Sequence, residues 1–276
     1  MKIFLTGGTG FVGSHFLQQV LAQGHEVIAL RRPGSQPRIE LSQQPVWLDG
    51  ALDGDHCASL AGVDVLVHLA SHTPNPPYDT LDRCLYWNVF APLQLARQAV
   101  EQGVKQFIVA GSCFEYGRSA DRLGDLDVDS PLEPALSYPT SKAAASVAFM
   151  GLARELNLHM KVLRIFQVYG EGEPANRLWP SLRKAALTGQ DFPMSGGEQV
   201  RDFISVEEVA RKFVLALDFS GSVLGQPFMG HVATGRPQSL LAFAQHWWRH
   251  WGGTGKLIVG AMPYRHNEVM RITSRK

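Results

Sequence analysis

The sequence predicts an α/β protein built on an open, doubly wound parallel sheet, with a smaller C-terminal lobe. A short β-branched and aromatic run at residues 2–6 leads into a glycine-rich turn and then into an amphipathic stretch through Ala22. Strand-like and helix-like segments then alternate over the first half of the chain. A Tyr-x-x-x-Lys motif, Tyr138 to Lys142, lies near its centre. Alternation of this kind implies parallel strands joined by right-handed crossovers.

The composition is that of an ordinary globular protein: 276 residues, 45% hydrophobic, 18% charged, with a formal net charge of +1. Because lysines and arginines are scattered, we expect no nucleic-acid or membrane partner and instead a small molecule. Cys57, Cys84 and Cys113 lack metal-ligand spacing and are odd in number, which favours reduced thiols and a cytoplasmic protein. No apolar run reaches the ~18 residues of a membrane helix, and glycines break the first one too early for a signal peptide.

The glycine-rich turn predicts a dinucleotide site. Its glycines fit G-x-G-x-x-G as Gly8, Gly10 and Gly13, and also the wider G-x-x-G-x-x-G spacing that begins at Gly7. In either reading the backbone can approach a pyrophosphate that lies at the positive end of the following helix. The motif stands between a strand and a helix, which is the context that such a site requires.

The end of the second strand bears on the choice of cofactor. Residues 26–30 read as a strand that ends in Arg31-Arg32, where a fold that prefers NAD places an acidic residue for the ribose hydroxyls. Two cations there favour the 2′-phosphate of NADPH. NAD stays the alternative, since both arginines could simply be solvated in the loop that follows.

The next two strands are expected at residues 46–49 and 63–70, with a short helix between them. The chain then enters a proline-rich loop, residues 71–78, at the carboxyl end of a strand, where open α/β sheets hold their ligands. We therefore expect this loop to form a lid or a pocket wall. His72 in the loop is either an acid or substrate contact, or a solvated side chain.

A long helix and a further strand complete the expected crevice. The helix is predicted over residues 81–102 and carries Asn88 within its apolar face, where a polar side chain needs a partner. The strand is predicted over residues 106–110. Ser112 follows that strand, and a serine in this place can donate a hydrogen bond into the crevice.

Tyr138 and Lys142 lie four residues apart and therefore share one face of a helix. A neighbouring ammonium stabilises a phenolate, so the lysine is expected to lower the pKa of the tyrosine toward neutral pH. Without other motifs, the same pattern would more often be a surface pair.

Two later helices are expected from their N-caps. Ser205 precedes a helix through Leu217 with two glutamates in its first turn, and Ser239 precedes a helix over residues 240–251. His246 and His250 in the latter lack the glutamate of the zinc-protease pattern, so we expect packing there and no metal.

These motifs occur in the order typical of one protein family. The chain resembles the extended short-chain dehydrogenase/reductase family, the NAD(P)-dependent epimerases, dehydratases and reductases of nucleotide sugars. The resemblance covers nearly the whole chain and implies a Rossmann-type doubly wound sheet. Its motifs are residues 6–13, 68–70, 112–117, 138–142, 163–170, 200–209 and 264–269.

The resemblance also implies the roles of the site residues. Tyr138 is the general acid, Lys142 binds the nicotinamide ribose, and Ser112 hydrogen-bonds the reacting oxygen. The expected cofactor contacts are Gly7, Gly10, Phe11, Val12, Gly13, Arg31, Arg32, Asp49, Leu69, Ala70, Tyr138 and Lys142. The expected substrate contacts are His72, Asn88, Ser112, Gln167, Arg201 and Arg265, the two arginines flanking a diphosphate.

Two departures from the family pattern narrow the choice of reaction. Sugar-nucleotide 4,6-dehydratases place an acidic pair directly after the serine or threonine, whereas this chain has Cys113 and Phe114. Dehydration is therefore disfavoured, and Cys113, with no adjacent histidine, is expected to be structural. Gln167 stands where many relatives have asparagine, which leaves the nucleotide contact there open.

The resulting prediction is an NADPH-dependent reductase of a dTDP-4-keto-6-deoxyhexose, acting as a homodimer. An epimerase with tightly bound NAD is the alternative of the same fold, and a non-catalytic NADP(H)-binding regulator is the alternative of another class. Residues 1–166 and 203–228 are expected to form the dinucleotide-binding domain, and residues 167–202 and 229–276 the substrate-binding lobe.

Overall fold

A computed structural model describes residues 1–265 and 268–275 and contains the predicted parallel sheet. All of its strand pairs are parallel. The prediction of a doubly wound α/β fold is confirmed. Across the sheet the seven strands are β12 (Phe228–Val232), β7 (His159–Ile165), β5 (Gln106–Ser112), β4 (Val65–His68), β1 (Lys2–Thr6), β2 (Glu26–Arg31) and β3 (Val46–Asp49).

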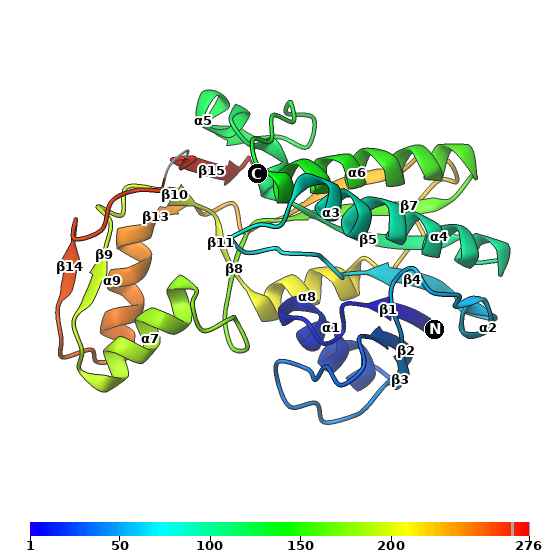
Figure 1. Cartoon of the computed structure of the whole chain (residues 1–276), viewed down its shortest axis with the longest axis horizontal. Coiled ribbons are helices and arrows are strands. Elements are labelled where there is room, and N and C mark those ends of the chain that lie inside the picture. Colours follow the sequence, from blue (N-terminus) through cyan, green and yellow to red (C-terminus); the bar gives the residue numbers. More distant parts are fainter. Residues whose placement is uncertain (266–267, 276) are drawn as a thin grey trace.

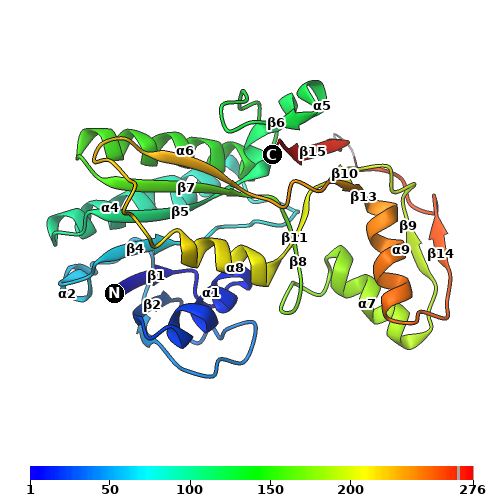
Figure 2. The same ribbon diagram turned by 180° about the vertical axis from the view of Figure 1, so that it is seen from behind.

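Helices cover both faces of this sheet, as Figures 1 and 2 show. One face carries α1 (Phe11–Ala22) and α8 (Val206–Leu215), and the other carries α4 (Ala91–Glu101) and α6 (Ser137–Glu155). The side chains of β1 alternate between the two layers: Ile3 and Leu5 are buried under α1 and α8, whereas Phe4 is buried on the opposite face. Alternate burial explains why the strands of this sheet read as nearly continuous apolar runs.

The helix predicted over residues 81–102 is interrupted by one π turn. The structure has α3 (Leu81–Leu85), the π turn η1 (Tyr86–Phe90) and then α4. Asn88 lies in the π turn and is buried. π turns inside helices often occur at functional sites. This one contains Asn88, the polar residue that was expected to need a hydrogen-bond partner.

The smaller lobe contains two small sheets and two helices, at the left of Figure 1. Aromatic side chains of α7 and α9 pack against each other, with the Trp179 and Trp247 rings 5.6 Å apart. Phe203 of β11 (Phe203–Ser205) stacks on Phe243 of α9 at 3.9 Å. A four-stranded sheet joins β13 (Gln238–Ser239), β10 (Val200–Arg201), β15 (Arg271–Ser274) and β6 (Asp125–Leu126), and the other elements are β9 (Phe192–Met194), β14 (Leu257–Val259), α7 (Leu178–Thr188) and α9 (Leu240–His250).

Strand pairing shifts the limits between the two parts. β12 carries residues 229–232 into the large sheet, beyond the expected boundary at residue 228, because it pairs with β7. β6 pairs with β15 and so joins the sheet of the smaller lobe from the first half of the chain. The pair β8 (Gln167–Tyr169) and β11 (Phe203–Ser205) connects the two parts.

The predicted N-caps of α8 and α9 are confirmed. The Ser205 hydroxyl accepts a hydrogen bond from the Glu208 amide at 3.3 Å, and the Ser239 hydroxyl accepts one from the Ala242 amide at 3.1 Å. Within the described residues, no helix is long and apolar enough to cross a membrane. The short elements α2 (Cys57–Leu60), α5 (Ser119–Leu123) and the 3-10 turn η2 (Cys113–Tyr116) complete the secondary structure.

Asp202, between β10 and β11, fixes the junction of the two parts. It is fully buried, and its carboxylate accepts hydrogen bonds from the Thr234 amide at 2.8 Å, the Thr234 hydroxyl at 2.6 Å and the Gly235 amide at 2.7 Å. Thr234 and Gly235 follow β12. One carboxylate thus holds together the segment that enters the smaller lobe from β12 and the segment that returns from it to α8.

Candidate functional site

The glycine turn between β1 and α1 is packed too closely for any side chain. A Cβ on Gly7, whose φ is +80°, would lie 2.5 Å from the Ala70 nitrogen, and one on Gly13 would lie 2.0 Å from the Gly7 oxygen. The turn therefore presses against the end of β4, beside the predicted contacts Leu69 and Ala70. Gly10, Phe11 and Val12 open α1 at its positive end, and this bare cradle fits a cofactor pyrophosphate.

The predicted cofactor contacts Arg31 and Asp49 bind each other across the ends of β2 and β3. The Arg31 Nε lies 2.7 Å from an Asp49 carboxylate oxygen, and its guanidinium stacks over the Trp47 ring at 4.7 Å. Arg32 points into solvent. The sequence did not foresee this pairing, which makes Arg32 the more available of the two cations for a 2′-phosphate.

The Tyr-Lys motif lies in the first turns of α6, against the carboxyl ends of β4 and β5. Tyr138 is 7% exposed and Lys142 is 3% exposed. The Lys142 Nζ donates to the Ala110 carbonyl at 2.7 Å. Hydrogen bonding with the Ser112 side chain, at the end of β5, favours the Tyr138 phenolate. The structure thus brings Ser112, Tyr138 and Lys142 together, on two elements far apart in sequence.

Burial controls the acidity of Tyr138. It raises the pKa of the phenol well above its usual value, and the hydrogen bonds with Ser71 and Ser112 only partly oppose this effect. The expectation that Lys142 brings this pKa toward neutral pH is therefore wrong for the described structure. Burial also lowers the pKa of Lys142. At neutral pH Tyr138 is a protonated phenol, which is the form that gives up a proton.

Asn88 and His72 hold the loop over the site. The Asn88 side chain accepts from the His72 amide at 2.7 Å and donates to the Ser141 hydroxyl at 2.9 Å, so its partners belong to the loop and to α6. The His72 ring lies 2.9 Å from an Asp79 carboxylate oxygen. Both predicted substrate contacts are thus tied into the wall of the crevice.

Two residues that the predicted set left out also face the reacting hydroxyl. Ser71 hydrogen-bonds Tyr138, and the Tyr78 ring lies against the Tyr138 ring with centroids 5.4 Å apart. Burial raises the pKa of Tyr78, and the charges of Arg177 and Arg265 oppose that rise. The charges of both arginines therefore reach Tyr78, and Arg177 also pairs with Glu173 at 3.4 Å. The proline-rich loop was the available signal, although the sequence alone did not select these side chains.

The other predicted substrate contacts lie where the two parts of the molecule meet. Arg201 is buried on β10 and donates to Glu268 at 2.8 Å, and to the carbonyls of Val200, Val269 and Met270. Arg265 is exposed and Gln167, on β8, is half-buried. In the described structure, Arg201 therefore binds residues 268–270, which follow Arg265 closely in the sequence.

Cys113, directly after Ser112, is 3% exposed, and burial raises the pKa of its thiol to about 12. A thiol so held stays protonated at neutral pH and is a poor nucleophile. Its burial agrees with the structural role expected from the sequence.

Known proteins with similar sequences are enzymes. A model of the NAD dependent epimerase/dehydratase family matches residues 3–226. The chain is 28% identical to the dTDP-6-deoxy-L-talose 4-dehydrogenase (NAD(+)) of Aggregatibacter actinomycetemcomitans, covering 76% of this chain and 77% of the relative. It is 26% identical to the CDP-abequose synthase of Salmonella muenchen, covering 98% and 87%.

Solved structures share the fold of this chain. An NAD-dependent NDP-hexosamine 5,6-dehydratase involved in tunicamycin biosynthesis superposes with a TM-score of 0.84 at 27% identity, covering 99% of this chain and 88% of that one. A UDP-glucose 4-epimerase of Thermotoga maritima, solved with UDP-glucose, has a TM-score of 0.84 at 23% identity, covering 100% and 90%.

Proposed function

Because the chain belongs to the NAD dependent epimerase/dehydratase family, we propose that it reduces the keto group of a nucleotide-linked 4-keto-6-deoxy sugar with NADPH. The observation that carries the proposal is the meeting of Ser112 and a protonated Tyr138 beside Lys142, with Cys113 and Phe114 in place of an acidic pair. This set can protonate a carbonyl oxygen. It lacks the acid and base that remove water in a 4,6-dehydratase.

The name of one relative supports a reaction at the sugar C4, and the name of another supports a nucleotide-linked sugar. One is a 4-dehydrogenase of a dTDP-linked 6-deoxy sugar, and in the reverse direction such an enzyme reduces the 4-keto sugar. The other makes a CDP-linked sugar and matches 98% of this chain. We therefore take a nucleoside diphosphate linked to a 4-keto-6-deoxyhexose as the substrate class, with the dTDP sugar first.

The side chains divide the chemistry of reduction between them. A bound nicotinamide cofactor supplies the hydride. Tyr138 donates its proton to the carbonyl oxygen as that oxygen gains charge, and Ser112 donates a hydrogen bond to the same oxygen. Lys142 holds the ribose next to the nicotinamide. The sugar carbonyl thus gains a hydride and a proton, and Tyr138 regains its proton from solvent.

Arg177 and Arg265 are the cations best placed for the diphosphate of the substrate. Both charges act on Tyr78, whose ring lies against Tyr138. An arginine offers a planar fork of donors that matches phosphate oxygens. Arg201 contributes indirectly, because it binds Glu268, three residues after Arg265. The sugar would then lie between this group and the Tyr138 hydroxyl.

The decisive experiment incubates the purified protein with dTDP-4-keto-6-deoxyglucose and NADPH. We expect stoichiometric loss of NADPH absorbance and one equivalent of a 6-deoxyhexose nucleotide. NADPH should bind more tightly than NADH by about tenfold, because a charge-assisted contact to a phosphate is worth about 1.5–3 kcal/mol. Arg32→Ala should remove that preference without weakening NADH, while the exposed Arg154→Ala serves as the control. NADH binding as tightly as NADPH would make NAD the cofactor.

Two rival reactions have support from the similar structures. The solved neighbours include an epimerase and a 5,6-dehydratase, and neither name implies net consumption of a reduced cofactor. If the protein carries bound NAD and converts one nucleotide sugar into another without oxidising NADPH, the reductase proposal is wrong. A product with altered configuration then indicates an epimerase, and a product that has lost water indicates a dehydratase.

We also propose that two copies pair through the outer face of η1, α4 and α6. Tyr86 and Phe90 of η1 and Val147 of α6 are exposed at 44%, 62% and 62%, an unusual group of apolar side chains for free surface. Arg97 and Glu155 form an ion pair between the two helices beside them. Light scattering should give the mass of two chains, and a monomer at micromolar concentration would refute the pairing.

A further inference from the structure

A buried carboxylate lies directly behind the proposed catalytic serine. Glu115, in the turn η2, is fully buried. One of its carboxylate oxygens accepts a hydrogen bond from the Ser112 amide at 2.7 Å, and the other accepts one from the Arg164 Nε at 2.7 Å. The Ser112 hydroxyl in turn accepts from the Phe114 amide at 3.2 Å. The last residue of β5, Ser112, is thus held by Glu115, three residues later in the chain.

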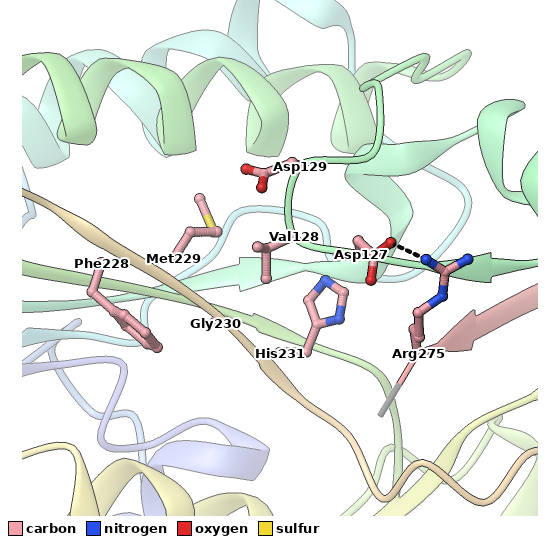
Figure 3. A pocket seen from close by; sticks show the side chains of 8 residues that line it. All are labelled: Asp127, Val128, Asp129, Phe228, Met229, Gly230, His231 and Arg275. Atoms are coloured by element: carbon pink, nitrogen blue, oxygen red, sulfur yellow. Dashed lines mark hydrogen bonds and ion pairs between the residues drawn. The ribbon is translucent and has the colours of Figure 1, made fainter.

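Arg164 extends this contact across the sheet. Its side chain is 4% exposed and donates to the Tyr116 hydroxyl at 2.7 Å and to the Val128 carbonyl at 2.8 Å. The Tyr116 hydroxyl hydrogen-bonds His231 on the edge strand β12. His231 lines a cavity of about 510 Å³, shown in Figure 3. Hydrogen bonds through Tyr116 therefore connect the ion pair with His231 on β12, the edge strand of the large sheet.

The ion pair packs closely against the Gly111 backbone. A Cβ on Gly111 would lie 2.8 Å from a Glu115 carboxylate oxygen and 3.0 Å from the Arg164 Cγ. Glycine is therefore required beside the ion pair. The position of Ser112 follows from this fixed pair and is not set by β5 alone.

Glu115 also acts on the two catalytic groups of α6. Burial lowers the pKa of Lys142 and the charge of Glu115 opposes that change. Burial raises the pKa of Tyr138, and Glu115 adds to that rise. In both cases the carboxylate favours the protonated form. Both groups must be protonated when the enzyme reduces a ketone.

Most other titratable groups near Lys142 and Tyr138 are uncharged at neutral pH, so they do not replace the negative charge of Glu115. His68 on β4 and His231 on β12 are uncharged at neutral pH, because burial lowers their pKa values to about 3 and about 4. Tyr116 and Cys113 stay protonated, because burial raises both pKa values to about 12. Tyr78, whose ring packs against Tyr138, also adds to the rise of the Tyr138 pKa. The other charged groups in this part of the described chain are Arg164, Arg201, Asp127 and Asp202.

We infer that Glu115 is a positioning residue for the proposed reduction: its carboxylate fixes the Ser112 main chain beside the Tyr138 hydroxyl and supplies the negative charge that faces Lys142. Arg164 holds that carboxylate in place through the ion pair at 2.7 Å. The inference rests on the proposed function, since it assigns the residue to the same site. Glu115 thus has two roles: its carboxylate accepts a hydrogen bond from the Ser112 amide, and it carries a negative charge. Different substitutions can remove one role and keep the other.

The test compares Glu115→Gln with Glu115→Asp by the pH dependence of kcat/KM for NADPH oxidation. Glutamine keeps an oxygen for the Ser112 amide but loses the charge, so Lys142 and Tyr138 should both lose their protons at lower pH. The alkaline limb should move down by about one to three pH units, the size of a nearby charge effect. Aspartate keeps the charge but is shorter, so turnover should fall while the limb stays in place.

Two further variants keep the test interpretable. Glu133→Gln makes the same change in an exposed pair with Arg122 and should leave the profile unchanged. If Glu115→Gln does not fold, Glu115→Gln combined with Arg164→Met removes both buried charges, and the limb should still move down, because Glu115 is the charge that acts on Lys142. A folded variant without Glu115 whose limb does not move overturns the inference.

Failure of the proposed function gives a different result. In that case the wild type does not oxidise NADPH with a keto sugar, and the variants are compared by cofactor affinity against pH instead. Because Lys142 is proposed to hold the ribose as a cation, affinity should fall on the alkaline side, and at lower pH in Glu115→Gln than in the wild type. Equal affinity profiles would overturn the inference whatever the reaction is.

Discussion

Tyr138→Phe is expected to lower kcat for reduction by roughly 10²–10⁴-fold, the contribution of a general acid. The substitution removes one hydroxyl from a ring that is 7% exposed and packed against Tyr78, so the fold should not change. Burial keeps the phenol protonated at neutral pH, which makes it a donor in the direction of reduction. Steady-state kinetics with saturating NADPH measure the effect.

Tyr86→Phe is the matched control for that prediction. Tyr86 is 44% exposed, and its hydroxyl donates to Asp53 at the surface, away from the crevice. Its loss should leave kcat unchanged. Near-full activity of Tyr138→Phe, with cofactor bound as tightly as in the wild type, would remove the tyrosine from the mechanism.

Arg164→Met is expected to lower the free energy of unfolding by about 3–5 kcal/mol, the usual cost of leaving a buried charge without its partner. The ion pair with Glu115 is almost completely buried, with side-chain exposures of 4% and 0%. Methionine fills similar volume, so the loss reports mainly the unpaired carboxylate. Urea denaturation followed by tryptophan fluorescence measures it.

Arg122→Met provides the comparison for an exposed ion pair. Arg122 and Glu133 lie 2.6 Å apart, but both side chains are in contact with water. Water solvates the carboxylate left behind, so little change in stability is expected. Equal losses in the two variants would mean that burial is not what makes the Arg164 pair costly to break.

The fold could be predicted because its signals are local. The glycine turn after β1 and the serine caps of α8 and α9 each depend on a few neighbouring residues. A helix cap satisfies amides within three residues, so the pattern survives in the sequence. The Tyr138 and Lys142 pair was visible for the same reason, since one helix turn joins them.

The properties that failed to follow from the sequence depend on distant partners. The acidity of Tyr138 was misjudged because burial, which depends on residues far along the chain, raises the pKa of the phenol. The pairing of Arg31 with Asp49 needs the alignment of β2 and β3, which no local pattern encodes. Asn88 was correctly expected to need a partner, but its partners were not foreseeable.

The buried ion pair of Arg164 does leave a trace in the sequence. Arg164 is a cation inside the apolar run of β7, and such a residue requires a buried counter-charge. Glu115 is the anion nearest to the predicted serine along the chain. The unmatched charge in an apolar strand and the acid next to Ser112 together indicate this ion pair, although 49 positions separate the two residues.

The joining of β6 to β15 sets the order in which the protein can be built. Their contacts link residues 146 and 148 positions apart, so β15, an inner strand of that four-stranded sheet, is synthesised long after β6. Contacts of such high sequence separation form slowly, because the chain loses loop entropy before it gains them. During synthesis β6 therefore has an unpaired edge until β15, near the C-terminus, has been made. The same pairing of β15 with β10 brings Glu268 to Arg201, so this contact also depends on the last strand of the chain.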